Sequence, residues 1–267
     1  MKYKIGIIQL NSKLDYKVNL ETIEGFLKGS REKELFAVFL PECFYSMSDG
    51  TKPTPYLVDR GNEHYENIKN LAKNYQVYLL GGSAATFSAD HSPKVLNRNY
   101  NFDPYGNELS HYDKRNLFSC RLEKDGKVKE INEGDIYAKG HSPTMIEAGD
   151  LKVGISICFD LRYPLLYQDY VNKGTNLISI SSAFTVPTGK AHWHTLVRAR
   201  AIETQCFVVA PGQWGRHNDR IQTYGHSLIV DPWGEILADA EEGEKLISAE
   251  IDLQKIETVR NSVKVFS

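Results

Sequence analysis

Cys158 is the residue of this sequence best placed for covalent chemistry. It follows the apolar, strand-like run 152–157 and precedes a helix-like segment. Ligands of open α/β sheets bind beyond the carboxyl ends of the strands, so we expect the Cys158 side chain to face such a crevice. Backbone N–H groups and a helix dipole at that position favour a thiolate over a thiol. The alternative is a small buried side chain, which we expect for Cys43, Cys120 and Cys206.

Two charged residues could assist such a nucleophile. Glu42 follows Pro41 at the end of the apolar run 35–40, which places its carboxylate at the rim of a sheet. Lys114 directly follows the run 109–113, the second arm of a predicted hairpin. Taken alone, Glu42 is typical of a solvated carboxylate or a helix cap, and Lys114 of an exposed cation. Each is a weak indication by itself, and the sequence around them carries more information.

The blocks that contain these residues resemble the nitrilase superfamily of carbon–nitrogen hydrolases. They occur in the order of that family, and the resemblance extends from Ile5 to about Phe266. It implies a catalytic triad of Glu42, Lys114 and Cys158. The blocks read Leu40-Pro41-Glu42, Tyr112-Asp113-Lys114-Arg115-Asn116-Leu117-Phe118 and Gly154-Ile155-Ser156-Ile157-Cys158-Phe159-Asp160-Leu161-Arg162-Tyr163-Pro164.

The resemblance also implies a second glutamate between the lysine and the cysteine. The family has it 25 residues before the cysteine and seven before a glycine, which fits Glu133 and Gly140. Glu130 lies nearby but misses this spacing. We expect Glu133 to balance the charge of Lys114 and to hold it in position.

The implied reaction is amide hydrolysis through a thioester. Cys158 attacks the amide carbon, while Glu42 takes the thiol proton, returns it to the departing ammonia and later activates water. Lys114 stabilises the oxyanion, together with the backbone N–H that follows Cys158. This scheme requires no metal and no organic cofactor.

Blocks in the C-terminal half are similar to those of the Nit-type amidases. The similarity is closest to the deaminated glutathione amidases, which implies metabolite repair and a small carboxylated amide as substrate. ω-Amidases, which act on α-ketoglutaramate, share most of these blocks, and a nitrilase would use the same residues. A catalytically silent binding protein is a further alternative. The blocks span residues 182–185, 188–193, 198–205, 215–217, 224–227 and 231–234.

Arg162 is the first candidate for substrate binding. It lies four residues beyond Cys158, and its guanidinium group is suited to a substrate carboxylate. The alternative is an ion pair with Asp160 or with a helix acid. Phe184 and Thr185, which follow a predicted strand, are weaker candidates. Leu165, where the family often has glutamate, leaves the finer substrate contacts open.

The histidines offer two competing sites. His192 and His194 could suggest a metal site, but on a helix they point about 200° apart, so we expect no site from this pair. A cysteine–histidine pairing of Cys158 with His192 or His226 stays open, since nothing in the sequence places either ring near the sulfur.

The elements that must position these residues alternate between strands and helices. The pattern predicts an α/β protein, and the resemblance implies a four-layer α-β-β-α sandwich in one domain, 1–267, that forms a homodimer through its outer helices. A hairpin turn is expected at 104–107 and a charged loop at 124–129. Apolar runs predict strands at 4–10, 35–40, 77–82, 152–157, 177–181, 206–210, 227–230 and 246–251, and helical spacing predicts helices at 18–27 (ending at Gly29), 65–74, 165–172 and 191–204.

Composition excludes several classes of protein. With 41% hydrophobic and 25% charged residues, the 267-residue chain is not disordered. A net charge of −2 predicts no binding to nucleic acid or to an acidic membrane surface. Its apolar runs are shorter than the ~20 residues of a membrane span. Four scattered cysteines and an N-terminus without a signal-peptide pattern predict a cytoplasmic protein with reduced thiols.

Overall fold

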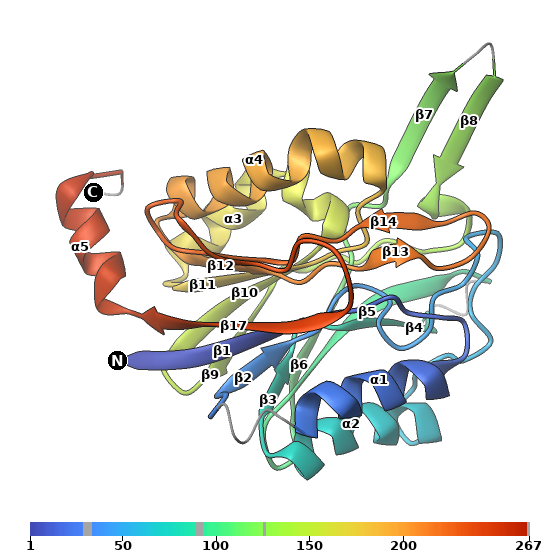
Figure 1. Cartoon of the computed structure of the whole chain (residues 1–267), viewed down its shortest axis with the longest axis horizontal. Helices are drawn as coiled ribbons and strands as arrows, with labels where there is room; N and C mark the ends of the chain where they lie inside the picture. Colours follow the sequence, from blue (N-terminus) through green and yellow to red (C-terminus); the bar gives the residue numbers. More distant parts are fainter. Residues whose placement is uncertain (29–33, 89–92, 125–126, 266–267) are drawn as a thin grey trace.

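Two β-sheets pack face to face, and helices cover the outer side of each sheet (Figure 1). The computed structural model describes residues 1–28, 34–88, 93–124 and 127–265. The predicted α-β-β-α sandwich is therefore confirmed. None of the described helices is long and apolar enough to cross a membrane.

The first sheet has the strand order β17-β1-β2-β3-β5-β4, and β6 pairs with β5. Its centre is parallel, since β1, β2 and β3 run in the same direction. The predicted hairpin at 104–107 is confirmed as the turn between β5 and β6. The strands are β1 (Lys2–Gln9), β2 (Ala37–Phe39), β3 (Tyr78–Leu80), β4 (Ser83–Phe87), β5 (Val95–Phe102), β6 (Glu108–Asp113) and β17 (Lys245–Asp252).

The second sheet has the order β16-β15-β12-β11-β10-β9, with β10, β11 and β12 parallel. Two smaller hairpins, β7–β8 and β13–β14, lie outside both sheets. The strands are β9 (Thr144–Ala148), β10 (Leu151–Ile157), β11 (Leu177–Ser181), β12 (Phe207–Ala210), β15 (Leu228–Val230), β16 (Ile236–Asp239), β7 (Ser119–Lys124), β8 (Lys127–Asn132), β13 (Trp214–Arg216) and β14 (Gln222–Tyr224).

Alternation along the strands of the first sheet builds two apolar layers. Ile5 and Ile7 of β1 belong to the core between the sheets, whereas Ile8 belongs to the core beneath the helices. In β2, Phe39 faces the first core and Val38 the second. Helices α1 (Tyr16–Lys28) and α2 (Glu63–Tyr75) cover the first sheet, α3 (Pro164–Asn172) and α4 (Val186–Thr204) cover the second, and α5 (Gln254–Ser262) lies at the C-terminal end (Figure 1).

Helix α4 begins at Val186, five residues before the predicted start at 191. Pro187 fits the first turn of a helix, where its missing N–H is not needed. Gly189 stays helical because the helix packs tightly there: a Cβ atom would lie 2.3 Å from the Tyr224 side chain. Gly189, which in the sequence is typical of a helix end, is instead a position where α4 packs closely against Tyr224.

The predicted charged loop at 124–129 is wrong where the structure describes it, because Lys124 ends β7 and 127–129 begin β8. Residues 125 and 126 lie outside the described residues, as does Gly29, the predicted end of the first helix. Strands β4, β7, β8, β9, β13, β14 and β16 and helix α5 were not predicted. These elements are short, polar or at an edge, and apolar patterning is weak there.

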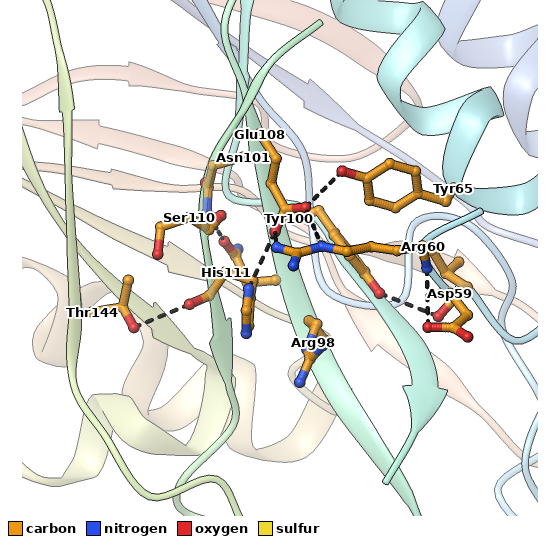
Figure 2. A network of polar contacts seen from close by, with 12 residues as sticks. Asp59, Arg60, Tyr65, Arg98, Tyr100, Asn101, Glu108, Ser110, His111 and Thr144 are labelled. Carbon is orange, nitrogen blue, oxygen red and sulfur yellow. Dashed lines mark hydrogen bonds and ion pairs between the residues drawn. The ribbon is translucent and has the colours of Figure 1, made fainter. Parts of the chain in front are cut away.

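Glu108, the first residue of β6, is the centre of a polar network that fixes this strand (Figure 2). Its carboxylate accepts hydrogen bonds from Arg60 at 3.0 and 2.9 Å, from Tyr65 of α2 at 2.6 Å and from the His111 ring at 3.1 Å. Burial alone would raise the pKa of Glu108, but the hydrogen bonds from His111, Arg60 and Tyr65 outweigh it and hold this pKa far below its ordinary value. Strand β6, which leads into Lys114, is thereby tied to α2 and to the loop before it.

Candidate active site

The predicted site residues lie at the ends of strands that meet between the two sheets. Glu42 lies three residues after β2, Cys158 comes directly after β10, and Lys114 directly after β6. Glu133 is the first residue of the short 3₁₀ turn η1 (Glu133–Asp135). Because β2 and β10 are central parallel strands, their carboxyl ends deliver the carboxylate and the thiol to one crevice.

Lys114 lies between the two glutamates. Its Nζ is 2.7 Å from Oε1 of Glu42 and 2.9 and 2.8 Å from the two carboxylate oxygens of Glu133. The Lys114 side chain is fully buried, so burial alone would lower its pKa. The charges of Glu133 and Glu42 outweigh this effect and raise the pKa well above its ordinary value. Lys114 is therefore a permanent cation at this position.

Glu42 is held by three donors besides being buried. Asn97 Nδ2 donates to Oε1 at 2.8 Å, and the backbone N–H of Ala183 donates to Oε2 at 2.9 Å, while Lys114 supplies the third bond. Asn97 comes from β5 and Ala183 follows β11, so both sheets fix the carboxylate. Only 2% of Glu42 is exposed.

Cys158 has a backbone φ of 49°, in the left-handed region that side chains other than glycine rarely adopt. This turn, between β10 and the 3₁₀ turn η2 (Cys158–Arg162), sets the direction of the thiol. Both the Glu42 carboxylate and the Ala183 N–H that donates to it act on the pKa of the Cys158 thiol, the first raising it and the second lowering it. The thiol and the carboxylate are therefore neighbours.

The expected preference for a thiolate is wrong for the resting site. Burial raises the pKa of Cys158, the negative charge of Glu42 raises it further, and Lys114 opposes this only in part. The net pKa is well above its ordinary value, so the sulfur carries a proton until a base removes it. The expectation relied on the dipole of a following helix and on backbone N–H groups, but only the short turn η2 directly follows the cysteine.

Glu133 anchors the lysine from the other side. One of its carboxylate oxygens also accepts the backbone N–H of Phe118 at 2.7 Å, which fixes the segment that follows Lys114. Burial raises the pKa of Glu133 and Lys114 lowers it, with a net increase. The competing Glu130 is exposed on β8, so the spacing that favoured Glu133 selected the residue that contacts Lys114.

The contacts of Gly140 explain why a glycine is required seven residues after Glu133. Its N–H donates to the carbonyl of Lys114 at 2.8 Å. A Cβ atom at this position would lie 2.1 Å from the carbonyl oxygen of Asp113. Any side chain at residue 140 would therefore displace the backbone that carries Lys114.

Asp160 is a site residue that the sequence reasoning missed. Its fully buried carboxylate accepts hydrogen bonds from the Ile157 N–H at 2.9 Å and the Tyr112 hydroxyl at 2.7 Å. Asn116 donates to it through both its backbone and its side chain, at 3.0 and 2.8 Å. Asp160 thus locks the turn of Cys158 onto the segment around Lys114. Its place in the block after the cysteine was a usable signal; Asn97, isolated on a strand, offered none.

Arg162 lies over two aromatic rings at the edge of the site. Its guanidinium carbon is 5.6 Å from the ring centres of Phe159 and of Phe184, and Nη2 is 3.2 Å from the His192 ring. The expected alternative partner, Asp160, uses its carboxylate for the bonds described above. The hydroxyl of Thr185 faces Thr188 in the first turn of α4, at 2.9 Å. Arg162 and Phe184 thus lie against each other.

The remaining cysteines agree only in part with the prediction of buried side chains. Cys206 is buried, but Cys43 and Cys120 are only partly buried. Cys120 lies on the β7–β8 hairpin, which projects away from the sandwich (Figure 1). Cys43 belongs to the turn after Glu42, and its backbone φ is 53°.

The two neighbouring histidines diverge, as expected from their spacing. His192 contacts Arg162, whereas His194 Nε2 lies 3.0 Å from Asp239. His226, the other histidine considered as a partner for the thiol, also faces Asp239, at 3.1 Å.

Comparison with known proteins adds to this geometry. The family model described as carbon-nitrogen hydrolase matches residues 4–261. The nitrilase and fragile histidine triad fusion protein NitFhit of Caenorhabditis elegans is 34% identical over 100% of this chain, which spans 60% of that protein. The deaminated glutathione amidase of Dictyostelium discoideum is 32% identical (99% of this chain, 92% of that protein).

The chain is also similar to an omega-amidase in sequence and to a solved structure of the nitrilase superfamily. The omega-amidase NIT2-A of Xenopus laevis is 33% identical over 99% of this chain and 94% of its own length. The crystal structure of Saccharomyces cerevisiae Nit3, a member of branch 10 of the nitrilase superfamily, superposes with a TM-score of 0.86 at 28% identity. The superposed region covers 100% of this chain and 96% of the Nit3 chain.

Proposed function

The chain belongs to the carbon–nitrogen hydrolase family, as an amide hydrolase acting on bonds other than peptide bonds, and we propose that it is a metal-independent amidase for a small carboxylated amide. One observation carries this proposal: the buried ammonium of Lys114 lies between Glu42 and Glu133, and the charges of Glu42 and Lys114 both act on the Cys158 thiol. A nucleophile, a proton carrier and a fixed cation are the three groups that amide hydrolysis needs.

The first half of the reaction forms a thioester and releases ammonia. Because burial keeps the Cys158 sulfur protonated, Glu42 must remove the proton as the sulfur attacks the amide carbon. The same carboxyl group then gives this proton to the nitrogen of the tetrahedral intermediate. The carbon–nitrogen bond breaks, ammonia leaves and the acyl group stays on the sulfur.

The second half hydrolyses the thioester. Glu42, again ionised, takes a proton from water as the water oxygen attacks the thioester carbon. The carbon–sulfur bond breaks, the sulfur recovers a proton and the carboxylic acid leaves. One amide and one water thus become one acid and one ammonia, and the enzyme returns to its starting state.

Lys114 supports both steps through its charge. It stabilises the oxyanion of each tetrahedral intermediate together with the backbone N–H that follows Cys158. Two carboxylates hold its pKa high, so it does not act as a base. Glu133 keeps the ammonium group in place and offsets its charge when the oxyanion is absent.

Deaminated glutathione is the substrate that we propose. Arg162 offers a guanidinium group for a substrate carboxylate, beside the Phe159 and Phe184 rings. The relative named deaminated glutathione amidase supports this choice. The relative named omega-amidase supports the second candidate, α-ketoglutaramate. We further propose cytoplasmic activity, with the four cysteines as free thiols.

Ammonia release tests the proposal. Purified enzyme is assayed with deaminated glutathione, α-ketoglutaramate and a simple nitrile, and kcat/KM is compared. We expect the highest kcat/KM with deaminated glutathione and no turnover by Cys158→Ala. The matched control, Cys206→Ala, removes a buried thiol far along the chain and should keep activity. Undiminished turnover by Cys158→Ala would contradict the mechanism, and preference for α-ketoglutaramate would select the second substrate.

A further inference from the structure

A second cluster of ligand-type side chains lies on the outer side of the second sheet. It consists of His194 on α4, His226 in the loop before β15 and Asp239 at the end of β16. One nitrogen of each histidine and a carboxylate oxygen of Asp239 all lie within 4.8 Å of one another. His194 lies 45 residues before Asp239 and His226 lies 13 before it, so only the fold reveals the cluster.

We propose that His194, His226 and Asp239 form a binding site for a divalent transition-metal ion of the zinc type. Two imidazole nitrogens and one carboxylate oxygen are a donor set that zinc accepts, with water as a fourth ligand. The proposal concerns stability rather than the hydrolytic reaction, and it does not rest on the proposed substrate.

The distances from Asp239 to the two histidines suit a metal ion. Asp239 Oδ2 lies 3.0 Å from His194 Nε2 and 3.1 Å from His226 Nδ1. Zinc with bonds of ~2.0 Å in tetrahedral geometry separates its ligand atoms by roughly 3.3 Å. The two oxygen–nitrogen distances differ from this value by a few tenths of an ångström, and the two histidine nitrogens, which lie within 4.8 Å of each other, complete the set of three ligand atoms.

The backbone of His226 is fixed before any metal binds. Its N–H donates to the Glu241 carbonyl at 2.9 Å, and its carbonyl accepts the Trp193 indole N–H at 2.7 Å. Its φ of 52° lies in the left-handed region, so these bonds maintain a conformation that a free loop would leave. The Tyr224 ring stacks on the imidazole at 4.5 Å. Such preorganisation is expected of a binding site.

The carboxylate of Asp239 contacts both imidazoles. Oδ1 accepts the Glu241 N–H at 2.7 Å and lies 3.1 Å from His226 Nδ1, while Oδ2 is within 3.1 Å of both imidazoles. The side chains of the three residues keep between 22 and 33% of their surface exposed, which admits an ion and a water ligand.

Binding would join α4 to β16 and to the loop before β15. Helix α4 starts directly after Thr185, and Phe184 lies against Arg162, the residue that we propose for the substrate carboxylate. The ion would therefore stabilise the helix that follows this contact, and the chain would melt at a higher temperature in its presence.

Isothermal titration calorimetry with zinc chloride tests the site. Chelator-treated full-length protein is compared with His194→Ala and Asp239→Asn, and His141→Ala removes an exposed histidine outside the cluster as the matched control. We expect one zinc ion per chain in the wild type and in His141→Ala, and affinity at least tenfold weaker in the two cluster variants. Zinc should raise the melting temperature of the wild type but not of Asp239→Asn.

Two controls keep the result unambiguous. Cys158→Ala should bind zinc as tightly as the wild type, which separates this site from capture by the thiol. Circular dichroism without zinc establishes that each variant folds, and Asp239→Asn preserves side-chain shape if His194→Ala does not fold. Equal zinc affinity in wild type and both cluster variants, or no binding by the wild type, would overturn the proposal and leave a histidine–aspartate cluster only.

Discussion

Three charges at the active site, those of the buried Lys114 and Glu42 and of the partly buried Glu133, determine how the cysteine can react. A thiolate beside Glu42 would put two negative charges in a space almost without water, and Lys114 is already shared with Glu133. Proton transfer from sulfur to Glu42 keeps the number of charges constant while the carbon–sulfur bond forms. This is why the carboxylate, rather than a preformed thiolate, is expected to control the rate.

Glu42→Gln tests this role at the scale of one residue. The amide has nearly the shape of the carboxylate but cannot carry the proton, so we expect kcat to fall by about 10²–10⁴-fold. Glu130→Gln changes an exposed glutamate on β8 and should keep full activity. Steady-state ammonia release measures both variants. A Glu42→Gln enzyme within threefold of the wild type would exclude Glu42 as the proton carrier.

At this scale, the central residues of the site could be predicted from the sequence, whereas the residues that hold them in place could not. Glu42, Lys114 and Cys158 stand in recognisable blocks, and spacing selected Glu133. Asn97, which donates to Glu42, is 55 residues away from it along the chain, and only the pairing of strands brings them together.

At the scale of the elements, β6 has to be held in place because it ends at Lys114. The pair of Arg98 and Asp113 joins β5 to β6 through two hydrogen bonds of 2.7 and 2.8 Å, one residue before the lysine. Glu108 fixes the opposite end of the strand (Figure 2). The strand is thus anchored at both ends.

Glu108→Gln should weaken this anchor in a pH-dependent way. The pKa of Glu108 is lower in the folded than in the unfolded protein, so its stabilising contribution is present above the unfolded pKa of about 4 and is lost as pH falls. At pH 7 we expect the variant to lose about 2–3 kcal/mol. The difference from wild type should shrink near pH 3. Urea unfolding at both pH values, with the exposed Glu21→Gln as control, measures this; a constant difference would contradict it.

Elements with strong apolar patterns were predictable, and those shaped by packing were not. The strand 177–181 was predicted with the bounds of β11, since every residue in it is buried. The start of α4 was missed because Gly189 is defined by its contact with Tyr224. Strands β13 and β14 form a short polar hairpin that apolar patterning does not indicate.

At the scale of the whole molecule, α3 and α4 form the outer layer over the second sheet (Figure 1). Ile202 of α4 and Trp233 in the turn before β16 are 48 and 58% exposed. They belong to one surface, since Arg198 of α4 donates to the carbonyl of Gly234 at 2.8 Å. We propose that a second copy of the chain covers this surface in a homodimer, because apolar side chains of this size favour burial.

Ile202→Glu tests the homodimer. A two-fold interface uses the same surface of both chains, so the substitution would bury a glutamate from each chain in it. We therefore expect a shift from dimer to monomer. Light scattering after gel filtration gives the mass, and Leu14→Glu serves as a control because this exposed leucine lies on the other side, near α1. A wild-type chain that elutes as a monomer, or an unchanged dimer in the variant, would contradict the proposed interface.

The fold class of the molecule could be predicted from the sequence, but the order of the strands within each sheet could not. Alternating strands and helices predicted an α/β protein, and the family resemblance predicted two sheets between helices. The order of strands depends on long-range pairing, such as β17 beside β1 at opposite ends of the chain, which local patterns do not contain.

Mass spectrometry of enzyme quenched with acid during turnover of deaminated glutathione tests the central claim most directly. We predict that an acyl group, with the mass of the substrate minus ammonia, is attached to Cys158 and to no other cysteine. An acyl group on Cys43, Cys120 or Cys206, or active enzyme with no acyl group at any time of quenching, would contradict the account.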